Sequence, residues 1–188
     1  MIDSHSAKGG RGWYILRATP TASWTGFKEG GLRPGRQGAI SSLWLGDFGF
    51  VWDGSKAEQK NLDWLRKRPY TILFLDGSHE NYDLLEQYPT EERFGGLVQP
   101  LGGNVYHVCG AAYWSWKGRK YLCFGGAESP DKEEREAHVN WWPQEMPSDE
   151  EYARCEAALE ANGWQVDYVL THDAPSKFLD FSVLAEGE

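Results

Sequence analysis

The run YTILFLDG, which spans Tyr70–Gly77, is the feature that most constrains the fold of this chain. Its apolar part has the length of a strand and shows no polar face, which is typical of a strand buried on both sides of a sheet. The segment VDYVLTHDAP (Val166–Pro175) repeats this pattern and predicts a second buried strand. Strands of this kind indicate an α/β fold, in which other layers cover both faces of the sheet.

Helix signals separate these strands. Ser55 and Glu58 have the spacing of a capping box, and Ser148 and Glu151 repeat it later in the chain. NYDLLEQY (Asn81–Tyr88) predicts a further short helix. The order of strands and helices predicts an α/β sandwich. Three glycine-punctuated pieces follow, NVYHVCG, AAYWSWKG and RKYLCFGG, for which an antiparallel meander over residues 104–126 is expected.

Bulk properties restrict the function. A length of 188 residues suits one domain. The net charge of −9 lacks the basic face that binding to a nucleic-acid backbone requires. The 3 cysteines are odd in number and without CxxC spacing, which favours reduced thiols. No apolar run is long enough to span a membrane, and no signal-peptide pattern opens the chain. A cytoplasmic protein without a membrane partner is therefore expected.

Polar side chains stand where the apolar runs end. Asp47 ends SLWLGD, His79 follows YTILFLDGS, and His172 lies at the end of the last predicted strand. Open α/β sheets place their sites at the carboxyl ends of strands. Residues 1–45 contrast with this pattern, because they show no sustained period and are rich in Gly, Thr, Ser, Pro and Arg. We expect an irregular segment over residues 1–45 and one domain over residues 46–188.

Five segments resemble calcineurin-like metallophosphoesterases, in particular a small bacterial and phage branch of that family. They are GDFGFVWDG, FLDGSHENYDLL, FGGAESPDKEERE, NWWPQEMPSDEEY and VDYVLTHDAP, in the order expected for the family. The resemblance implies a β-sandwich flanked by helices. It also implies a centre of two divalent metals, Mn, Fe or Zn, which hydrolyses phosphomonoesters or phosphodiesters with a metal-activated water.

The resemblance also assigns roles to residues. Asp47 matches the metal-bridging aspartate, His172 matches a histidine ligand, and His79 matches the histidine that faces the phosphate and helps to protonate the leaving oxygen. Ser78 stands where the family has an asparagine ligand, and a hydroxyl is the poorer donor to a divalent cation. Ala18-Thr19-Pro20 stands where the first Asp-x-His block is expected, and no Gly-His-x-His block occurs before Glu188. The metal site is therefore expected to be incomplete.

A shift of reading frame explains the missing first block. RATPTASWTGF (Arg17–Phe27) can be encoded by codons that, read in another frame, give Gly-Asp-Thr-His-Gly-Lys-Leu-Asp-Arg-Phe. This string is the first metal-binding block of the family with its usual continuation. We hypothesise that residues 16–45 are translated out of frame and that the frame is restored just before Gly46. The nucleotide sequence of the gene tests this hypothesis.

Each candidate has a structural alternative. Asp47 could be a turn or N-cap aspartate, and His79 could cap the following helix. His107 is expected to be a satisfied core histidine, and Asp76 is expected to brace a turn. Trp141 and Trp142 are expected to pack against the core or a lid, with a substrate platform as the alternative, and DKEERE is expected to be a solvated loop.

Two functions remain open at the level of the sequence, and a damaged gene product without a selected role is the third alternative. The first is a metal-dependent phosphoesterase with weak or lost activity, in which Asp47, Ser78 and His172 bind metal and His79 acts as the acid. The second is a non-catalytic acidic protein that reuses the sandwich to bind or inhibit a protein partner with a basic surface. The first predicts Mn-dependent turnover that falls on Asp47→Asn, and the second predicts salt-sensitive association that this change leaves intact.

Overall fold

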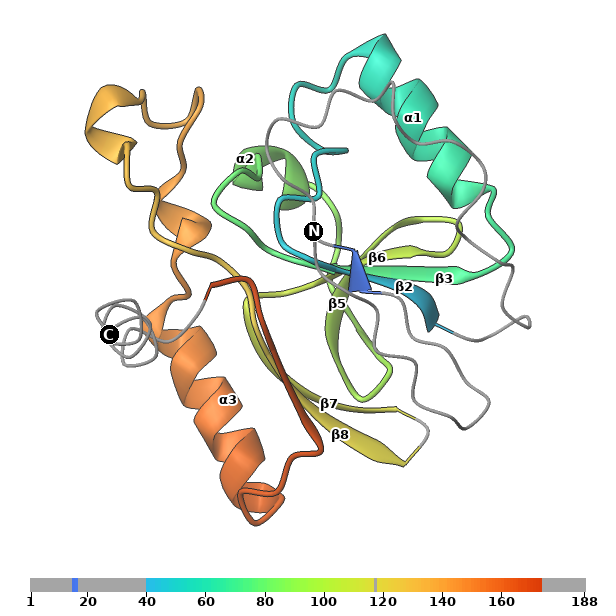
Figure 1. Cartoon of the computed structure of the whole chain (residues 1–188), viewed down its shortest axis with the longest axis vertical. Helices are drawn as coiled ribbons and strands as arrows, with labels where there is room; N and C mark the ends of the chain where they lie inside the picture. The colour runs from blue at the N-terminus through green and yellow to red at the C-terminus, as the bar shows by residue number, and fades with distance from the viewer. Residues whose placement is uncertain (1–14, 17–39, 117, 174–188) are drawn as a thin grey trace, which may run out of the picture.

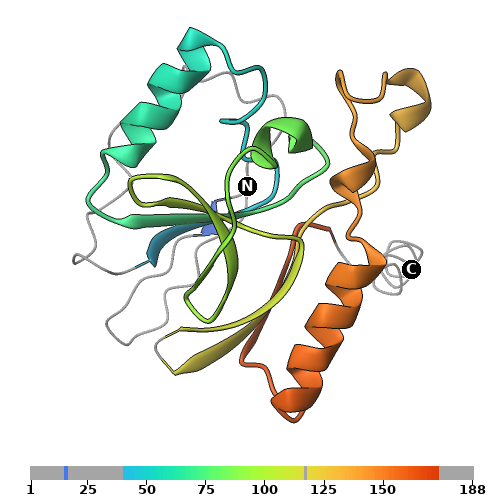
Figure 2. The same ribbon diagram turned by 180° about the vertical axis from the view of Figure 1, so that it is seen from behind.

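A computed structural model describes residues 15–16, 40–116 and 118–173, and Figures 1 and 2 show it from opposite sides. The strands of this part of the chain form two sheets. The first sheet has the order β1-β2-β3-β6-β5-β4, and the second has the order β7-β8-β9. Together with the helices, the two sheets place the chain in the mixed α/β class.

The first sheet is parallel in its middle and antiparallel at one edge. β2 pairs in parallel with β1 and β3, and β3 pairs in parallel with β6, whereas β5 is antiparallel to β6 and β4. Its strands are β1 (Ile15–Leu16), β2 (Ile40–Leu45), β3 (Thr71–Leu75), β6 (Val105–Val108), β5 (Gly96–Gly102) and β4 (Glu91–Arg93).

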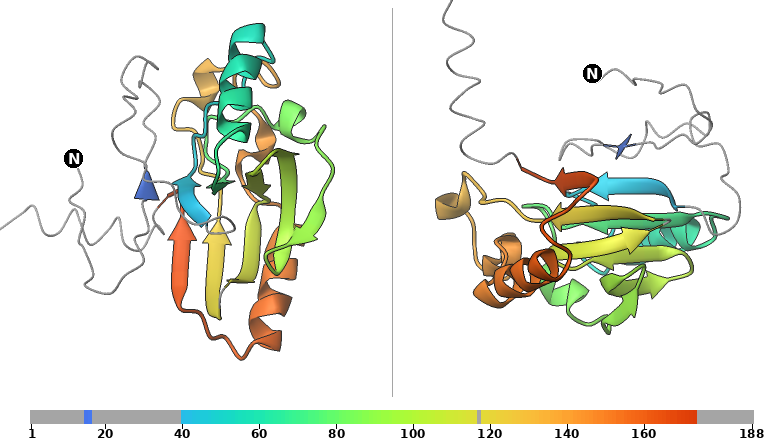
Figure 3. Two further views of the ribbon diagram at one scale, coloured as in Figure 1. Left: turned by 90° about the vertical axis from the view of Figure 1, so that its right-hand side faces the viewer. Right: turned by 90° about the horizontal axis from the view of Figure 1, so that it is seen from below.

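The second sheet consists of a hairpin and one parallel strand. β7 (Ala111–Trp116) and β8 (Arg119–Phe124) are antiparallel, and β9 (Tyr168–Thr171) lies parallel to β8. Figure 3 shows β8 and β9 side by side with the same direction. The carboxyl ends of β8 and β9 consequently lie at the same edge of the sheet.

Side-chain alternation along β3 creates two cores. Ile72 and Phe74 point to the core that packs under α1, whereas Leu73 and Leu75 point to the core between the two sheets. All four are at most 1% exposed, as expected for a strand covered on both faces. The central strand predicted from YTILFLDG is thereby confirmed.

Three α-helices and two short 3-10 helices complete the described part. They are α1 (Lys56–Arg66), α2 (Tyr82–Leu85), η2 (Lys132–Glu134), η3 (Pro143–Glu145) and α3 (Asp149–Ala161). Figure 1 shows α1 beside the first sheet and α3 on the far side of the second sheet. The chain between β8 and α3 reaches across to α2 in both views.

The two capping predictions have different outcomes. Ser148 and Glu151 form the full capping box that starts α3. At α1, the Ser55 hydroxyl accepts the Glu58 N–H as predicted, but the Glu58 carboxylate accepts the backbone N–H groups of residues 52–54 instead of the Ser55 N–H. Ser55 N–H donates to the Asp53 carboxylate. Glu58 therefore orders the loop before the helix rather than the cap itself.

The predicted meander over residues 104–126 is wrong in its first strand. β6 pairs with β3 and β5 in the first sheet, and only β7 and β8 form an antiparallel pair. The chain changes sheet at Gly110, which has a φ of 51° and donates its N–H to Asp76 Oδ2 at 2.9 Å. A side chain at this position would collide with the Glu151 carboxylate, so the turn between the sheets depends on glycine.

The last strand also differs from its prediction. β9 was expected to be buried, but Tyr168 and Val169 are 47% and 58% exposed. Consecutive strand residues point to opposite faces, so the start of β9 is exposed on both of them. Among the described residues, β9 pairs only with β8 and forms the edge of its sheet.

Part of the segment expected to be irregular is ordered. Ile40–Leu45 form β2, which lies between β1 and β3 in the first sheet. Residues 17–39, which contain most of the hypothetical out-of-frame stretch and the position of the missing Asp-x-His block, lie outside the described residues. In the described part, no helix is long and apolar enough to cross a membrane.

Candidate metal centre at the strand ends

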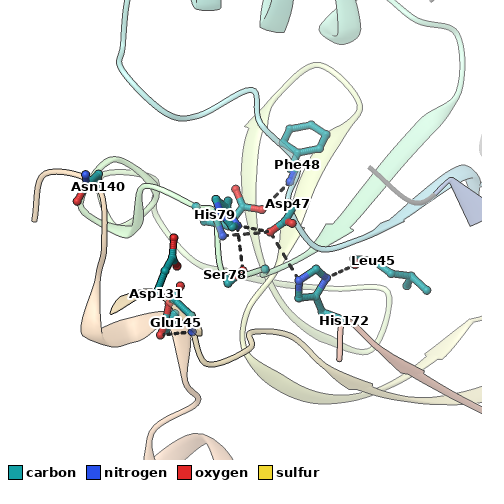
Figure 4. A network of polar contacts seen from close by, with 12 residues as sticks. Leu45, Asp47, Phe48, Ser78, His79, Asp131, Asn140, Glu145 and His172 are labelled. Carbon is teal, nitrogen blue, oxygen red and sulfur yellow. Dashed lines mark hydrogen bonds and ion pairs between the residues drawn. The ribbon is translucent and has the colours of Figure 1, made fainter. Parts of the chain in front are cut away.

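The four residues predicted for the site come together at the carboxyl ends of three strands. Asp47 follows β2, Ser78 and His79 follow β3, and His172 follows β9. His79 Nδ1 and His172 Nε2 each lie 3.6 Å from Asp47 Oδ1, and Ser78 Oγ lies 2.9 Å from His79 Nδ1 (Figure 4). We refer to Asp47, Ser78, His79 and His172 as the rim cluster. Their proximity is observed, whereas their ligand roles remain predictions.

Two glycines make this approach possible. A Cβ on Gly46 would lie 2.1 Å from His172 Nδ1, and a Cβ on Gly77 would lie 2.3 Å from Asp47 Oδ1 and 2.2 Å from Asp47 N. All three distances are far below van der Waals contact. Gly46 also has a φ of 87°, which side chains rarely adopt. The Gly-Asp and Asp-Gly dipeptides therefore let the loops of β2, β3 and β9 touch.

Asp47 is held in an unusual conformation. Its φ of 49° lies in the left-handed region, which aspartate tolerates better than most residues do. Its Oδ1 accepts the His79 N–H at 3.0 Å. Burial alone would raise the pKa of this carboxyl, but the hydrogen bond with His79 and the nearby imidazoles of His172 and His79 outweigh it and lower the pKa. Asp47 is therefore an ionised oxygen donor at neutral pH.

His172 presents one nitrogen to Asp47. Its Nδ1 lies 2.6 Å from the Leu45 carbonyl oxygen, which can only accept, so Nδ1 carries the hydrogen. In the neutral ring the lone pair is therefore on Nε2, which faces Asp47 Oδ1. Two ligands of one Mn, Fe or Zn ion, each about 2.0–2.2 Å from it, lie about 3.0–3.6 Å apart for angles between 90° and tetrahedral. The observed 3.6 Å suits a single cation.

The remaining donors are weaker. The Ser78 hydroxyl contacts His79 Nδ1, and His79 Nε2 contacts the guanidinium of Arg135 at 2.8 Å. Residues 15–16, 40–116 and 118–173 contain no group of three or more His, Cys, Asp and Glu side chains arranged to hold a metal ion. Asp47 Oδ1 and His172 Nε2 are therefore the two donors that face each other here, fewer than the three or four protein ligands of ordinary zinc sites.

Arg135 is the site residue that the sequence did not reveal. It lies in the DKEERE segment, whose Asp131, Glu133, Glu134 and Glu136 are exposed as a solvated loop predicts. Its own side chain is only 15% exposed and turns inward to His79. The one available signal is the spacing of four residues between Asp131 and Arg135, which suits an ion pair and indeed forms one at 2.9 Å.

The loop that carries Arg135 is attached to α2. Trp142 Nε1 donates to Asp83 Oδ2 at 2.8 Å, and His138 Nδ1 lies 3.1 Å from the same oxygen. Trp142 is buried and meets Trp52 edge to face at 5.3 Å between ring centroids. The packing role predicted for Trp142 is confirmed, and this packing fixes the loop above the rim cluster.

A second polar group, which we call the buried cluster, begins at Asp76, two residues before Ser78. It consists of Asp76, His107 and Gln99, all less than 9% exposed. Asp76 Oδ1 contacts His107 Nε2, Asp76 Oδ2 accepts the Gly110 N–H at 2.9 Å, and His107 Nδ1 lies 2.7 Å from Gln99 Oε1. The predictions of a satisfied core histidine and a turn-bracing aspartate are confirmed.

Burial and charge act in opposite directions in this cluster. Burial alone would lower the pKa of His107, but the Asp76 carboxylate overrides it and raises the pKa to about 10. His107 is therefore protonated and donates from both nitrogens. Glu80 lies nearby with no exposed surface; its Oε1 accepts the Phe48 N–H at 2.6 Å, and burial raises its pKa well above the usual range.

The rim cluster thus brings together a carboxylate, two imidazoles and a hydroxyl, and the guanidinium of Arg135 contacts the other nitrogen of the His79 ring. Comparisons with protein-family models, curated proteins and solved structures found no match to this chain. The resemblance to calcineurin-like metallophosphoesterases therefore remains a prediction from the sequence segments.

Proposed function

We propose that this chain binds one divalent cation through Asp47 and His172 and supports slow hydrolysis of phosphate esters. The observation that carries the proposal is the position of Asp47 Oδ1 opposite His172 Nε2 at 3.6 Å. Both residues follow strand ends whose glycines leave room for them. The resemblance of the surrounding segments to metallophosphoesterases supplies the class of reaction.

The donor pair suits the metals of that family. A carboxylate oxygen and an imidazole nitrogen bind Mn, Fe and Zn well, and the Leu45 carbonyl fixes the ring orientation of His172 as an outer-shell partner. A cation held by Asp47 and His172 would lower the pKa of a bound water, so that this water can give up one proton, and would offset the charge of the phosphoryl group. In hydrolysis the water oxygen joins phosphorus, the ester P–O bond breaks and the leaving oxygen takes a proton.

The same donor count explains why the activity should be low. Ser78 supplies a hydroxyl where a stronger oxygen donor is expected, and no second cation has ligands among the described residues. Phosphoryl transfer draws most of its catalysis from positioning and charge stabilisation. A single cation supplies only part of both, so the turnover should be slow.

Metal content after loading with Mn²⁺ and desalting tests the proposal. Wild type should retain measurable Mn²⁺, at no more than about one ion per chain, because Asp47 and His172 are its two facing donors. Asp47→Asn and His172→Ala should retain almost none. His138→Ala is the matched control, because His138 is an exposed histidine whose partner is Asp83. Retention near zero in wild type would overturn the proposal.

Turnover of an aryl phosphate then tests the reaction. Mn²⁺ should produce a slow hydrolysis that Asp47→Asn abolishes and His138→Ala leaves unchanged. Hydrolysis that persists in Asp47→Asn, or that is insensitive to removal of Mn²⁺, would show that the rim cluster is not its source.

A further inference from the structure

Arg135 offers a function that the strand-end donors do not supply. We propose that Arg135 binds the phosphoryl oxygens of a phosphate ester and, by turning to them, releases the Nε2 atom of His79. The inference rests on the proposed function, because it concerns the substrate that this function requires. According to this proposal, Arg135 contacts His79 when no substrate is bound, and the substrate replaces His79 as the partner of Arg135.

The direction of the hydrogen bonds carries the first step. A guanidinium can only donate, so His79 Nε2, 2.8 Å from Arg135 Nη2, must accept. His79 is then neutral with its hydrogen on Nδ1, which donates to Ser78 Oγ at 2.9 Å. In this state Nε2 has no proton to give to a leaving oxygen. The acid role predicted for His79 therefore requires Arg135 to move.

The chemistry of the partners carries the second step. A neutral imidazole nitrogen is an uncharged acceptor, whereas a phosphoryl oxygen is anionic. Hydrogen bonds between a guanidinium and an anionic oxygen are about twice as strong as bonds between neutral partners. A phosphoryl group that reaches the rim cluster should therefore displace His79 from Arg135.

The guanidinium is already positioned for this exchange. Asp131 Oδ2 accepts from Nη2 at 2.9 Å, and the Asn140 carbonyl accepts from Nη1 at 3.2 Å. Asn140 Oδ1 also accepts the Glu136 N–H at 2.7 Å, which ties both ends of the loop together. Figure 4 shows Asp131 and Asn140 on the side of His79 that faces away from His172. A phosphoryl group that takes the place of His79 on Arg135 would thus meet a guanidinium that two other acceptors already hold.

The surrounding charges set a condition. Asp47 and Asp131 are both carboxylates near the same space, so the cluster without a cation repels an anion. A divalent cation at Asp47 and His172 removes this repulsion. Phosphate binding should therefore be weaker without the cation, and Arg135 should contribute to it both with and without the cation.

Titration of inorganic phosphate into 15N-labelled protein, with and without Zn²⁺, tests the inference, with chloride as the ionic-strength control. Long-range 1H–15N spectra report which nitrogen of His79 carries hydrogen. Zn-loaded wild type should bind phosphate and shift the Nε2 signal of His79. Arg135→Gln should bind phosphate at least about tenfold more weakly, because a charged donor is lost. The phosphate affinity of Arg135→Lys should lie between those of wild type and Arg135→Gln, since lysine keeps the positive charge but lacks the paired N–H donors of a guanidinium.

Arg119→Gln is the matched control, because Arg119 is an exposed arginine that begins β8, at the opposite end of that strand from the site. Unchanged Zn²⁺ affinity in Arg135→Gln shows that the fold and the donor pair survive the substitution. Equal phosphate affinity in Arg135→Gln and wild type would overturn the inference. So would phosphate binding that leaves the His79 Nε2 signal unmoved, or a Zn-loaded wild type that binds no phosphate.

The outcomes for the two proposals are separable. If wild type binds no metal, the proposed function fails, and the metal-free titration decides the role of Arg135 by itself. Phosphate-specific displacement of the His79 signal, absent in Arg135→Gln, would then sustain an anion site. No displacement at phosphate concentrations of tens of millimolar would overturn it.

Discussion

The rim cluster and the buried cluster are built in opposite ways. In the buried cluster, Asp76 and His107 are in direct contact and their other polar atoms reach Gln99 and Gly110. In the rim cluster, Asp47 faces the nearest nitrogens of His79 and His172 across 3.6 Å, which is beyond a hydrogen bond.

This difference separates a structural site from a site with capacity for a ligand. Polar groups whose partners all come from the protein are satisfied and stabilise the fold. Facing donors that are too far apart for a hydrogen bond with each other could share a ligand that lies beside both of them. Removing a group should therefore cost stability in the buried cluster and ligand affinity in the rim cluster.

The largest effect on stability is expected from Asp76→Ala. The substitution leaves a buried, protonated His107 without its carboxylate, and breaking such a pair costs about 3–5 kcal/mol. Asp47→Asn should cost about 1 kcal/mol, because its amide retains an oxygen that can accept the His79 N–H. Denaturant unfolding of both variants measures the difference. Equal losses of unfolding free energy in the two variants would mean that both clusters contribute to stability in the same way.

A smaller loss, of about 1–3 kcal/mol, is expected from Gly77→Ala, because the added Cβ would overlap the backbone and carboxylate of Asp47. Mn²⁺ retention should fall with it, since Asp47 must shift. Gly163→Ala is the control, because Gly163 has a φ of 66° but nothing within 4 Å of a Cβ. Normal Mn²⁺ retention in Gly77→Ala would show that the close approach of the loops is not needed.

Ser78→Asn should act in the opposite direction and improve the rim cluster. An amide carbonyl is a better donor to a divalent cation than the hydroxyl is, so Mn²⁺ affinity should rise by about tenfold, or about 1.4 kcal/mol. Isothermal titration with Mn²⁺ measures it. Ser115→Asn is the control, because Ser115 is exposed. Ser129 is unsuitable, because it is buried against Glu145. An unchanged or weaker affinity would place Ser78 outside the cation site.

The smallest effect concerns the attachment of the Arg135 loop to α2. The hydrogen bond from Trp142 and the proximity of His138 lower the pKa of Asp83 below 3.8. A lowered pKa stabilises the fold above the unfolded pKa, and this contribution disappears as pH falls through the folded pKa. The denaturation midpoints of wild type and Asp83→Asn should therefore differ at pH 5–7, and the difference should shrink as the pH falls below 3.8 toward the folded pKa. A gap that stays constant down to pH 3 would argue against the ionised form as the attachment point.

The sequence predicts those parts of the molecule that local chemistry determines. β3 follows from an apolar run with no polar face, and the start of α3 follows from Ser148 and Glu151. The proximity of Asp47 and His79 follows from polar residues placed directly after β2 and β3, because parallel strands of one sheet bring their carboxyl ends to one edge. His172 follows β9 of the second sheet, so its approach depends on how the two sheets pack. Which ligand the rim cluster binds remains a prediction.

Other parts depend on tertiary contacts that no local pattern contains. β4 and β5 were not predicted, because Gly95, Gly96 and Pro100 are typical of loops and their pairing with β6 is a long-range contact. Arg135 resembles its exposed neighbours in sequence, and only the packing of Trp142 turns its loop inward. The exposed face of β9 has the same origin, since burial of a strand depends on what lies beside it.

The contact between His172 and the Leu45 carbonyl joins residues separated by 127 positions in the chain. Contacts of such long range form late in folding, because a large loop must close before they contribute. A cation bound between Asp47 and His172 should therefore act little on the folding rate and mostly on the unfolding rate. The bound cation would thus lengthen the lifetime of the folded chain by slowing its unfolding.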